Sequence, residues 1–232
     1  MAVSLLSRGD FLCLDRRVLA PLREASANDL ILATLSVDAE MMIHGYGVGI
    51  FAMPIPGNDT RPEVYAWYLP EIRSVIPLPP PPGTWLARPP RSLRKSMRGF
   101  SISVNRDFAT VLQSCADIPR EGGWISPALE HAYLTLHAQG RAISVETRTP
   151  GGELAGGLFA VRLGEFISGE SMFHLRPDAS KAALAVLVDI AMAQGLRFID
   201  AQWPTDHLRR MGAIEVSWRV YLDALEGKPL AG

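Results

Sequence analysis

Three polar side chains, Glu170, Asp200 and Gln202, stand near the ends of two stretches that are otherwise apolar. Residues 165–173 and 196–202 alternate as strands do, which places Asp200 and Gln202 on one face of the second strand. A carboxylate can accept a proton and an amide can orient a reacting group. Each acid by itself could equally be a turn or capping residue, but the three together indicate the polar mouth of a catalytic site.

The elements that must position these side chains are a strand, a buried helix and a second strand within residues 163–207. Asp178 is expected to cap the helix, whose stretch 182–192 is apolar nearly all round, and Gly195 fits a left-handed C-cap. A right-handed crossover sets the two strands parallel and adjacent. Ligands of open α/β sheets bind at the carboxyl ends of the strands, so we expect the polar groups there.

The stretch before this unit predicts an antiparallel meander, because residues 141–173 alternate between apolar and polar with a TPGG turn inside them. The same alternation places Glu170 and Met172 on one face. A meander followed by a helix and a parallel strand is also how acyl-CoA N-acetyltransferases are built. We therefore expect an α/β (α+β) fold with a mixed sheet. The helix entrance, RPDASK, lacks a glycine-rich pyrophosphate loop, so the acyl carrier should differ from coenzyme A.

Two domains are expected, a small N-terminal domain over 1–71 and an acetyltransferase-like catalytic domain over 72–232. The proline-rich stretch 77–90 cannot be a helix or a central strand and favours a polyproline connector between them; the alternative is an ordered loop on one domain. Residues 1–30 show little periodicity and predict only short strands or turns. Ser36 should then cap a helix that ends near Gly45 to Gly49.

The formal net charge of −1 predicts no general affinity for polyanions. Residues 71–120, however, carry eight basic and three acidic side chains. A cluster of four cations within this segment either forms a solvated helix face or neutralises a few phosphates; it consists of Arg91, Arg94, Lys95 and Arg98.

Several classes of function are disfavoured by the motifs. Two cysteines without a CxxC pair, and no secretory leader, indicate a cytoplasmic protein with free thiols. The histidines lack the spacing of a zinc site, and there is no Walker loop. Ser171 lacks the second glycine of a nucleophile elbow, which argues against a serine hydrolase. No apolar run is long enough to cross a membrane.

Six short motifs in this order resemble those of the bacterial leucyl/phenylalanyl-tRNA-protein transferases, and the likeness runs from about Ser36 to the C-terminus. They are GIF at 49–51, SMRGF at 96–100, EGGWI at 121–125, GESMF at 169–173, ASKAAL at 179–184 and IDAQ at 199–202. The resemblance implies transfer of Leu, Phe or, less readily, Met from aminoacyl-tRNA to proteins that begin with Arg or Lys, which marks them for degradation. It implies a reaction without cofactor or metal, because the aminoacyl ester is already activated. We also expect a monomer that does not involve a membrane.

The resemblance also assigns roles to residues. Gln202 would hold the attacking amine, Asp200 would orient or help deprotonate it, and Glu170 would complete the polar relay. Leu158, Met172 and Phe173 would line an apolar pocket for the aminoacyl side chain, and Trp124 would stack on the terminal adenosine. The basic cluster would meet acceptor-stem phosphates. Further substrate contacts are assigned to Phe51, Met53, Gly169 and Ser171.

One departure from the family concerns the nucleotide. After GIF the family continues Pro-Trp, whereas this chain reads Ala52-Met53. Either Trp67 or Tyr68 takes the place of the missing aromatic ring, or nucleotide binding is weaker. The alternatives to the assignment are a related transferase with other acceptor residues, an N-acyltransferase of the same fold that acts on a small amine, and an RNA-binding module without activity.

Overall fold

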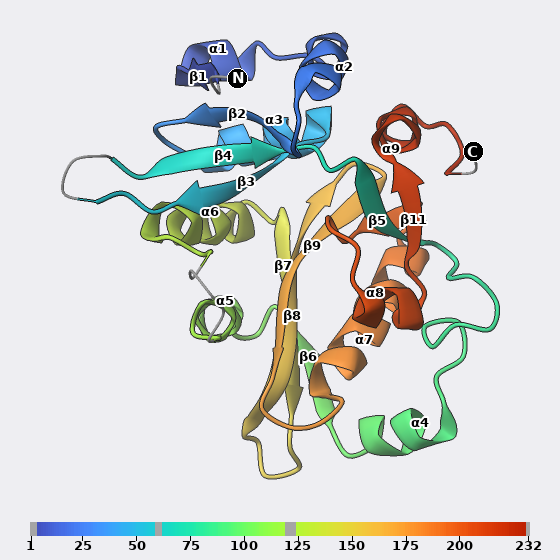
Figure 1. Ribbon diagram of the computed structural model, residues 1–232. Coiled ribbons are helices and arrows are strands. Elements are labelled where there is room, and N and C mark those ends of the chain that lie inside the picture. Colours follow the sequence, from blue (N-terminus) through green and yellow to red (C-terminus); the bar gives the residue numbers. More distant parts are fainter. Residues whose placement is uncertain (1–3, 59–61, 119–123, 231–232) are drawn as a thin grey trace. The chain divides into compact units, whose positions relative to one another are not determined.

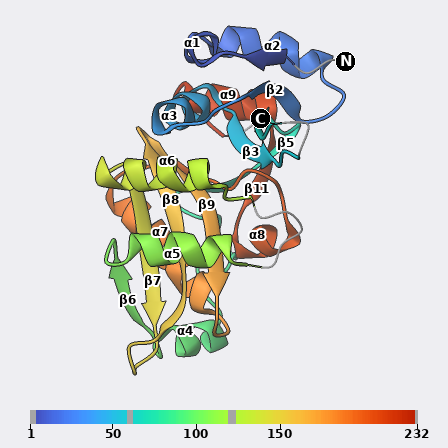
Figure 2. The ribbon, with the colours of Figure 1, turned by 90° about the vertical axis from the view of Figure 1, so that its left-hand side faces the viewer.

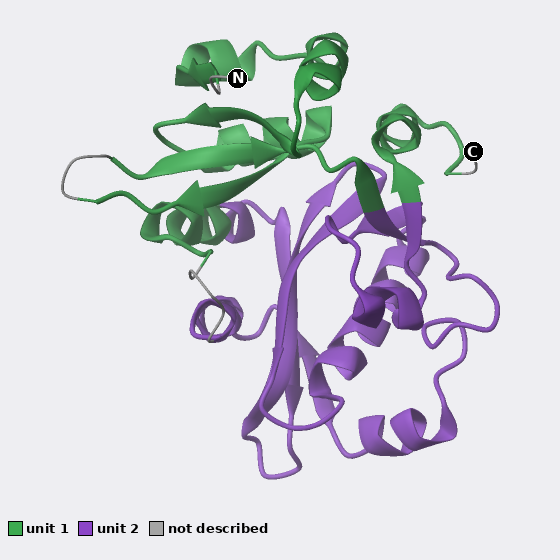
Figure 3. Ribbon diagram, viewed as in Figure 1, with its two compact units in different colours: residues 1–73, 124–135, 216–232 green, residues 74–123, 136–215 purple. Residues whose placement is uncertain are grey.

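The computed structural model describes residues 4–58, 62–118 and 124–230 and divides into two compact units (Figures 1 and 3). Unit 1 consists of residues 1–73, 124–135 and 216–232, and unit 2 of residues 74–123 and 136–215. The first boundary lies two residues beyond the division expected at residue 71. Unit 1 also includes two later segments, 124–135 and 216–232, which the sequence pattern does not predict.

Unit 1 is built on a four-stranded sheet in the order β1-β2-β4-β3. β1 and β2 are parallel, and the remaining pairs are antiparallel. Its strands are β1 (Ser4–Leu6), β2 (Leu30–Thr34), β3 (Phe51–Ile55) and β4 (Val64–Tyr68). Its helices are α1 (Arg8–Leu12), α2 (Arg16–Ala25), α3 (Ala39–Val48) and α9 (Trp218–Leu225), together with most of α6 (Pro127–Ala138).

Besides the short strand β1, the N-terminal segment contains the helices α1 and α2, so the prediction of only strands or turns over residues 1–30 is wrong. Asp15 caps α2: its carboxylate accepts hydrogen bonds from the backbone N–H groups of Arg17 and Val18. The apolar pattern of this segment is too weak to predict the helix. The helix expected after Ser36 is present as α3, but its cap is Asp38, whose carboxylate accepts the N–H of Met41 at 2.9 Å.

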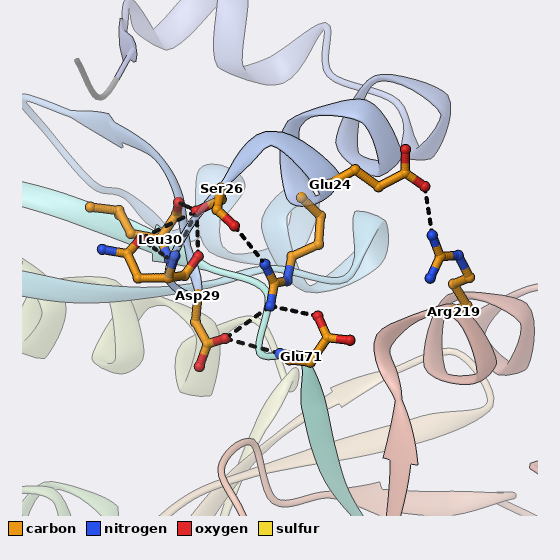
Figure 4. A network of polar contacts seen from close by, with 8 residues as sticks. Glu24, Ser26, Asp29, Leu30, Glu71 and Arg219 are labelled. Atoms are coloured by element: carbon orange, nitrogen blue, oxygen red, sulfur yellow. Dashed lines mark hydrogen bonds and ion pairs between the residues drawn. The ribbon is translucent and has the colours of Figure 1, made fainter. Parts of the chain in front are cut away.

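A buried arginine ties the end of α2 to the chain before β2 and β5 (Ile72–Pro77). The Arg23 side chain is 7% exposed, and its Nη2 contacts Glu71 Oε2 at 2.8 Å and Asp29 Oδ1 at 3.3 Å. Asp29 Oδ1 also accepts the backbone N–H of Glu71, as Figure 4 shows. The buried cation therefore has anionic partners, without which its desolvation would be costly.

Unit 2 holds most of a seven-stranded sheet in the order β11-β5-β10-β9-β8-β7-β6. β6 to β9 are antiparallel neighbours, which confirms the meander, and β9 and β10 are parallel and adjacent as the crossover predicts. The strands are β6 (Ser101–Val104), β7 (Ala142–Arg148), β8 (Leu154–Leu163), β9 (Phe166–His174), β10 (Phe198–Asp200) and β11 (Ile214–Ser217). The helices are α4 (Arg91–Met97), α5 (Phe108–Ala116), α7 (Ala179–Ala193) and α8 (Asp206–Met211).

Helices α5 and α7 cover opposite faces of this sheet (Figures 1 and 2). Leu184, Leu187 and Val188 of α7 are buried in one cluster with Leu158 and Ile167 of the sheet. The helix approaches β8 closely at Gly156, where a Cβ atom would lie 2.7 Å from that of Ala179. The prediction of a mixed α/β fold, with a meander followed by a helix and a parallel strand, is confirmed.

The ends of α7 are formed differently. Gly195 adopts the left-handed conformation (φ 68°) that the sequence predicts for it. Asp178 stands at the N-cap position, but its side chain makes no capping hydrogen bond. Instead it accepts the Lys181 ammonium at 2.7 Å, and the hydrogen bond from Lys181 is the main cause that lowers the pKa of the Asp178 carboxyl. The capping prediction is therefore wrong about the partner.

The proline-rich stretch 77–90 lies within unit 2, so the prediction of a connector between units is wrong and the alternative of an ordered loop holds. The Leu86 backbone N–H donates to the Met211 carbonyl at 3.0 Å, and the Lys181 ammonium lies 5.0 Å from the centre of the Trp85 ring. Proline stiffness thus serves a loop that packs on its own unit.

A buried carboxylate joins the meander to the start of α5. Glu146 of β7 is fully buried. Its Oε1 accepts the Ser144 hydroxyl at 2.5 Å and the Asp107 backbone N–H at 3.3 Å, and its Oε2 accepts the Ser103 hydroxyl at 2.6 Å. Three donors compensate the desolvation of this group, and each would be left without its acceptor if the carboxylate were removed.

We predict that Glu146→Ala lowers the free energy of unfolding by about 2–4 kcal/mol, because it strands three donors in the interior. The matched control is Glu165→Ala, whose side chain is 72% exposed beside Arg197 and should change stability by less than about 1 kcal/mol. Denaturant unfolding of the two variants measures the difference. Equal losses would show that the buried network contributes nothing.

A second prediction concerns the ion pair at the start of α7. Lys181→Met should raise the pKa of the Asp178 carboxyl toward its ordinary value, because the main group that lowers it is removed. A lowered carboxyl pKa stabilises the fold above the unfolded pKa, and this contribution is lost as the pH falls through the folded pKa. NMR titration of the Asp178 carboxyl checks the shift, and an unchanged titration would contradict it.

Candidate functional site

The candidate site lies where β9 and β10 cease to pair. Their parallel register aligns Phe198 with Phe166 and Asp200 with Ser168, and β10 ends there while β9 continues to His174. Glu170 and Gln202 each lie two residues beyond this last pair. The register therefore brings the polar residues of both segments to the same end of the ladder, at the carboxyl end of β10.

Gln202 lies outside the strand, so the prediction that the strand extends to it in strict alternation is wrong. Its φ of 55° is in the left-handed region, a conformation that non-glycine residues rarely adopt. Three hydrogen bonds hold it. Its backbone N–H donates to Asp200 Oδ1 at 3.0 Å, its carbonyl accepts the Ser74 N–H at 2.9 Å, and its side-chain Nε2 donates to Ser168 Oγ at 3.0 Å. Asp200 and Ser168 are both fully buried.

A β-bulge at Glu170 interrupts the alternation along β9. Phe159 pairs with Ser171, whereas the next residue, Ala160, pairs with Gly169, so Glu170 is the extra residue. The bulge puts Ser168 and Ser171 on one face and Gly169 and Met172 on the other, so the alternation expected through residues 165–173 is wrong beyond Gly169. Bulges re-aim side chains next to active sites.

The apolar residues proposed for the aminoacyl pocket divide between the two faces. Leu158 pairs with Met172, and both contact the cluster under α7. Phe173 lies beside Gly157 on the face covered by α5, where a Cβ at Gly157 would meet the Phe173 ring at 3.2 Å and Val111 at 3.4 Å. The three side chains thus do not form one wall together.

Gly169 and Ser171 flank the bulge. A Cβ at Gly169 would be at an ordinary contact distance of 3.5 Å from β10, so packing alone does not demand glycine there. The Ser171 hydroxyl is buried and has no hydrogen-bond partner among the residues that the structure describes.

The remaining aromatic and apolar candidates belong to unit 1. Phe51 is buried, with the Arg73 guanidinium 4.7 Å from its ring centre. Met53 is half-buried in β3. Trp124 is half-buried and meets Tyr133 of α6 edge-on, with ring centres 6.1 Å apart. Of the motif EGGWI, residues 121–123 lie outside the described residues.

The two aromatics that could replace the missing tryptophan differ in exposure. Trp67 is fully buried, and its indole N–H donates to Thr34 Oγ1 at 3.0 Å, so it cannot stack on a nucleotide. Tyr68 is half-buried, burial raises the pKa of its phenol, and its ring lies 6.1 Å from that of Phe51. Tyr68 is therefore the better candidate of the two.

The basic cluster lies on and beside α4. Its four side chains are exposed, while Leu93 on the same helix is buried. None of the four makes an ion pair with a residue in the described part of the chain. Four unneutralised cations within eight residues form a local anion-attracting surface in a protein of nearly zero net charge.

The described residues contain no group of three or more His, Cys, Asp or Glu side chains placed to hold a metal ion. No helix among them is long and apolar enough to cross a membrane.

Sequence reasoning missed Ser168. The signal was a hydroxyl that alternates with Phe166 on an apolar strand, but only the register with β10 shows that it lies beside Asp200.

Comparison with solved structures gives weak likenesses. A crystal structure of FemX aligns over 93% of this chain and 78% of its own, with 11% identity and a TM-score of 0.49. A structure of L-PGS from Bacillus licheniformis aligns over 74% of this chain, which spans only 52% of that longer one, with 14% identity and a TM-score of 0.40.

Comparison of sequences is more specific. The family model described as leucyl/phenylalanyl-tRNA protein transferase matches residues 85–226. A leucyl/phenylalanyl-tRNA–protein transferase of Ruegeria pomeroyi is 43% identical over 194 residues, which cover 83% of this chain and 87% of the relative. The matched region contains the end of the β9–β10 ladder and the basic helix α4. The chain belongs to the leucyl/phenylalanyl-tRNA–protein transferase family.

Proposed function

We propose that this chain moves Leu or Phe, and less readily Met, from aminoacyl-tRNA to the amino group of proteins that begin with Arg or Lys. The transferase activity and its place in the N-end rule pathway of protein degradation follow from the family. The observation that supports the mechanism is the fixed position of Gln202 beside the buried Asp200.

The reaction is aminolysis of an ester. The neutral α-amine attacks the aminoacyl carbonyl carbon, a C–N bond forms, the bond from that carbon to the ribose oxygen breaks, and the proton lost by the amine balances the one gained by that oxygen. A protein α-amine has a pKa of about 7.7–8.0, so roughly a tenth is neutral at pH 7. Holding it against the carbonyl supplies most of the acceleration.

The proposed roles follow the geometry. Gln202 Oε1 accepts an N–H of the attacking amine, while one N–H of Nε2 donates to Ser168 Oγ. Asp200 accepts the Gln202 backbone N–H and thereby fixes that backbone, and it orients the amine or helps to deprotonate it. Glu170, at the bulge, completes the polar relay.

The other substrate contacts are proposed from the family resemblance together with the described surroundings. The aminoacyl side chain contacts Met172 and Leu158 or Phe173 on the two faces of β9, beside Gly169 and Ser171. Trp124 stacks on the terminal adenosine, with Phe51 and Met53 as further contacts. Arg91, Arg94, Lys95 and Arg98 bind acceptor-stem phosphates, which gives affinity without sequence readout. We propose that the protein acts as a monomer in the cytoplasm.

We predict that Gln202→Ala lowers the rate of Leu transfer by about 100-fold or more, since one positioned polar group at the reacting centre is removed. The assay follows radiolabelled Leu from charged tRNA to peptides that begin with Arg, Lys, Asp, Glu or Met. Gln194→Ala is the matched control, because Gln194 is exposed at the end of α7.

Each outcome of this assay decides between functions. Label on Arg and Lys peptides that is lost only in Gln202→Ala supports the proposal. Label on Asp or Glu peptides would replace the proposed acceptors with acidic ones. Intact charged tRNA with no transfer to any peptide would reject the activity, and ribonuclease-resistant acylation of a small amine would favour the other acyltransferase.

We predict that Arg94→Ala with Lys95→Ala raises KM for aminoacyl-tRNA while leaving kcat unchanged, and that the salt dependence of log affinity becomes shallower by roughly 0.7–0.9 for each lost phosphate contact. Arg209→Ala serves as the control, since that exposed cation is already paired with Asp206 and Glu215. Binding measured from low to moderate salt checks the slope. An unchanged slope would show that α4 does not meet phosphates.

A further inference from the structure

Ser168 occupies a special place on β9. It is the last residue of β9 that pairs with β10, directly beside Asp200, and it is fully buried. Its hydroxyl oxygen accepts a hydrogen bond from Gln202 Nε2 at 3.0 Å. This buried hydroxyl thus contacts the side chain that is proposed to hold the amine, and it can influence the position of that side chain.

The contacts on Gln202 come from different elements and act on different atoms. Asp200 Oδ1 takes the backbone N–H and Ser74 of β5 donates to the carbonyl, while the Ala201 N–H donates to the Ser74 carbonyl at 2.9 Å. These bonds secure a left-handed backbone that an unsupported glutamine would rarely adopt. They fix where the side chain begins. Among the described residues, Ser168 is the one that contacts the amide at its tip through a hydrogen bond.

The turn of the amide matters for chemistry. A glutamine amide presents two N–H donors on one side and a carbonyl acceptor on the other. An attacking amine must keep its lone pair for the carbonyl carbon, so the protein has to accept an N–H from it. An amide turned by 180° would place its own N–H groups against the N–H of the amine, and no hydrogen bond could form. In the structure the Ser168 hydroxyl accepts from Nε2, and this contact leaves Oε1 as the end of the amide that can accept from the amine.

We propose that Ser168 is a positioning residue that orients the Gln202 amide so that Oε1 faces the attacking amine. This role rests on the proposed function, because it needs Gln202 to contact that amine. Ser168 itself touches no reacting atom in this scheme, so its whole effect passes through Gln202. The bulge at Glu170, two residues on, lets β9 re-aim its remaining side chains without disturbing this contact.

The test is a double-mutant cycle on the rate of label transfer at saturating aminoacyl-tRNA. Ser168→Ala should lower kcat by about 10- to 100-fold, as small misplacements of catalytic groups do, with KM for aminoacyl-tRNA unchanged. In the Gln202→Ala background the same change should have no further effect, since coupled residues are not additive. Ser168→Thr, which keeps the hydroxyl, should restore at least part of the rate.

Ser144→Ala is the matched control, because it removes another fully buried serine hydroxyl of the same sheet. It should lower stability without changing kcat. A loss of kcat in Ser168→Ala that persists unchanged in the Gln202→Ala background would overturn the inference, and so would a wild-type kcat in Ser168→Ala.

A second readout does not use the reaction. The side-chain amide of Gln202, assigned by its absence from the 15N spectrum of Gln202→Ala, should show slowed hydrogen exchange that Ser168→Ala abolishes. Unchanged exchange would overturn the inference while transfer by the wild-type chain upholds the proposed function. If the wild-type chain transfers no label to any peptide, the proposed function fails and this role fails with it.

Discussion

The burial of α7 is the interaction on which the larger unit depends. Its alanine and leucine side chains pack against β7, β8 and β9, and Gly156 allows the first turn to approach β8 more closely than any side chain would permit. A helix that is apolar on nearly all sides is stable only when it is buried. Because it links β9 to β10, its docking forces the two strands into one parallel ladder. Apolar packing therefore determines where the polar end of that ladder lies.

The site therefore combines two kinds of constraint. Hydrophobic packing sets the positions and the register of the strands. A few directional hydrogen bonds then set the side chains at the end of the ladder. Gln202 shows the second kind: the carboxylate of Asp200, the backbone of Ser74 and the hydroxyl of Ser168 hold a conformation that the chain alone would not favour. Such preorganisation suits a reaction that needs positioning more than a strong base, because the ester is already activated. The basic cluster of α4 does not need such exact positioning, since attraction of phosphates requires charge and exposure more than exact geometry.

Elements with a strong local signal follow from the sequence. The meander, the buried helix and its left-handed Gly195 are all present, since alternation, apolar runs and glycine act over a few residues. The failures share a physical origin. A bulge at Glu170 is an inserted residue that only pairing with β8 reveals, and Asp178 prefers the ammonium of Lys181 to the backbone it was expected to cap. Trp67 was a candidate for contact with a nucleotide, but it is fully buried. The sequence does not show this, because exposure is a property of the folded unit.

The sequence by itself determined the chemical inventory and the family: which acids, amides and cations exist, in which order, and with which motifs. It also determined the parallel strand pair, because chirality leaves one way to close the crossover. Only the tertiary structure decided which of these groups meet. The contact between Ser168 and Gln202 joins residues 34 positions apart, and their separation in the folded chain depends on register, bulge and the turn after β10. No local pattern encodes such a distance, since it is the sum of packing throughout the unit.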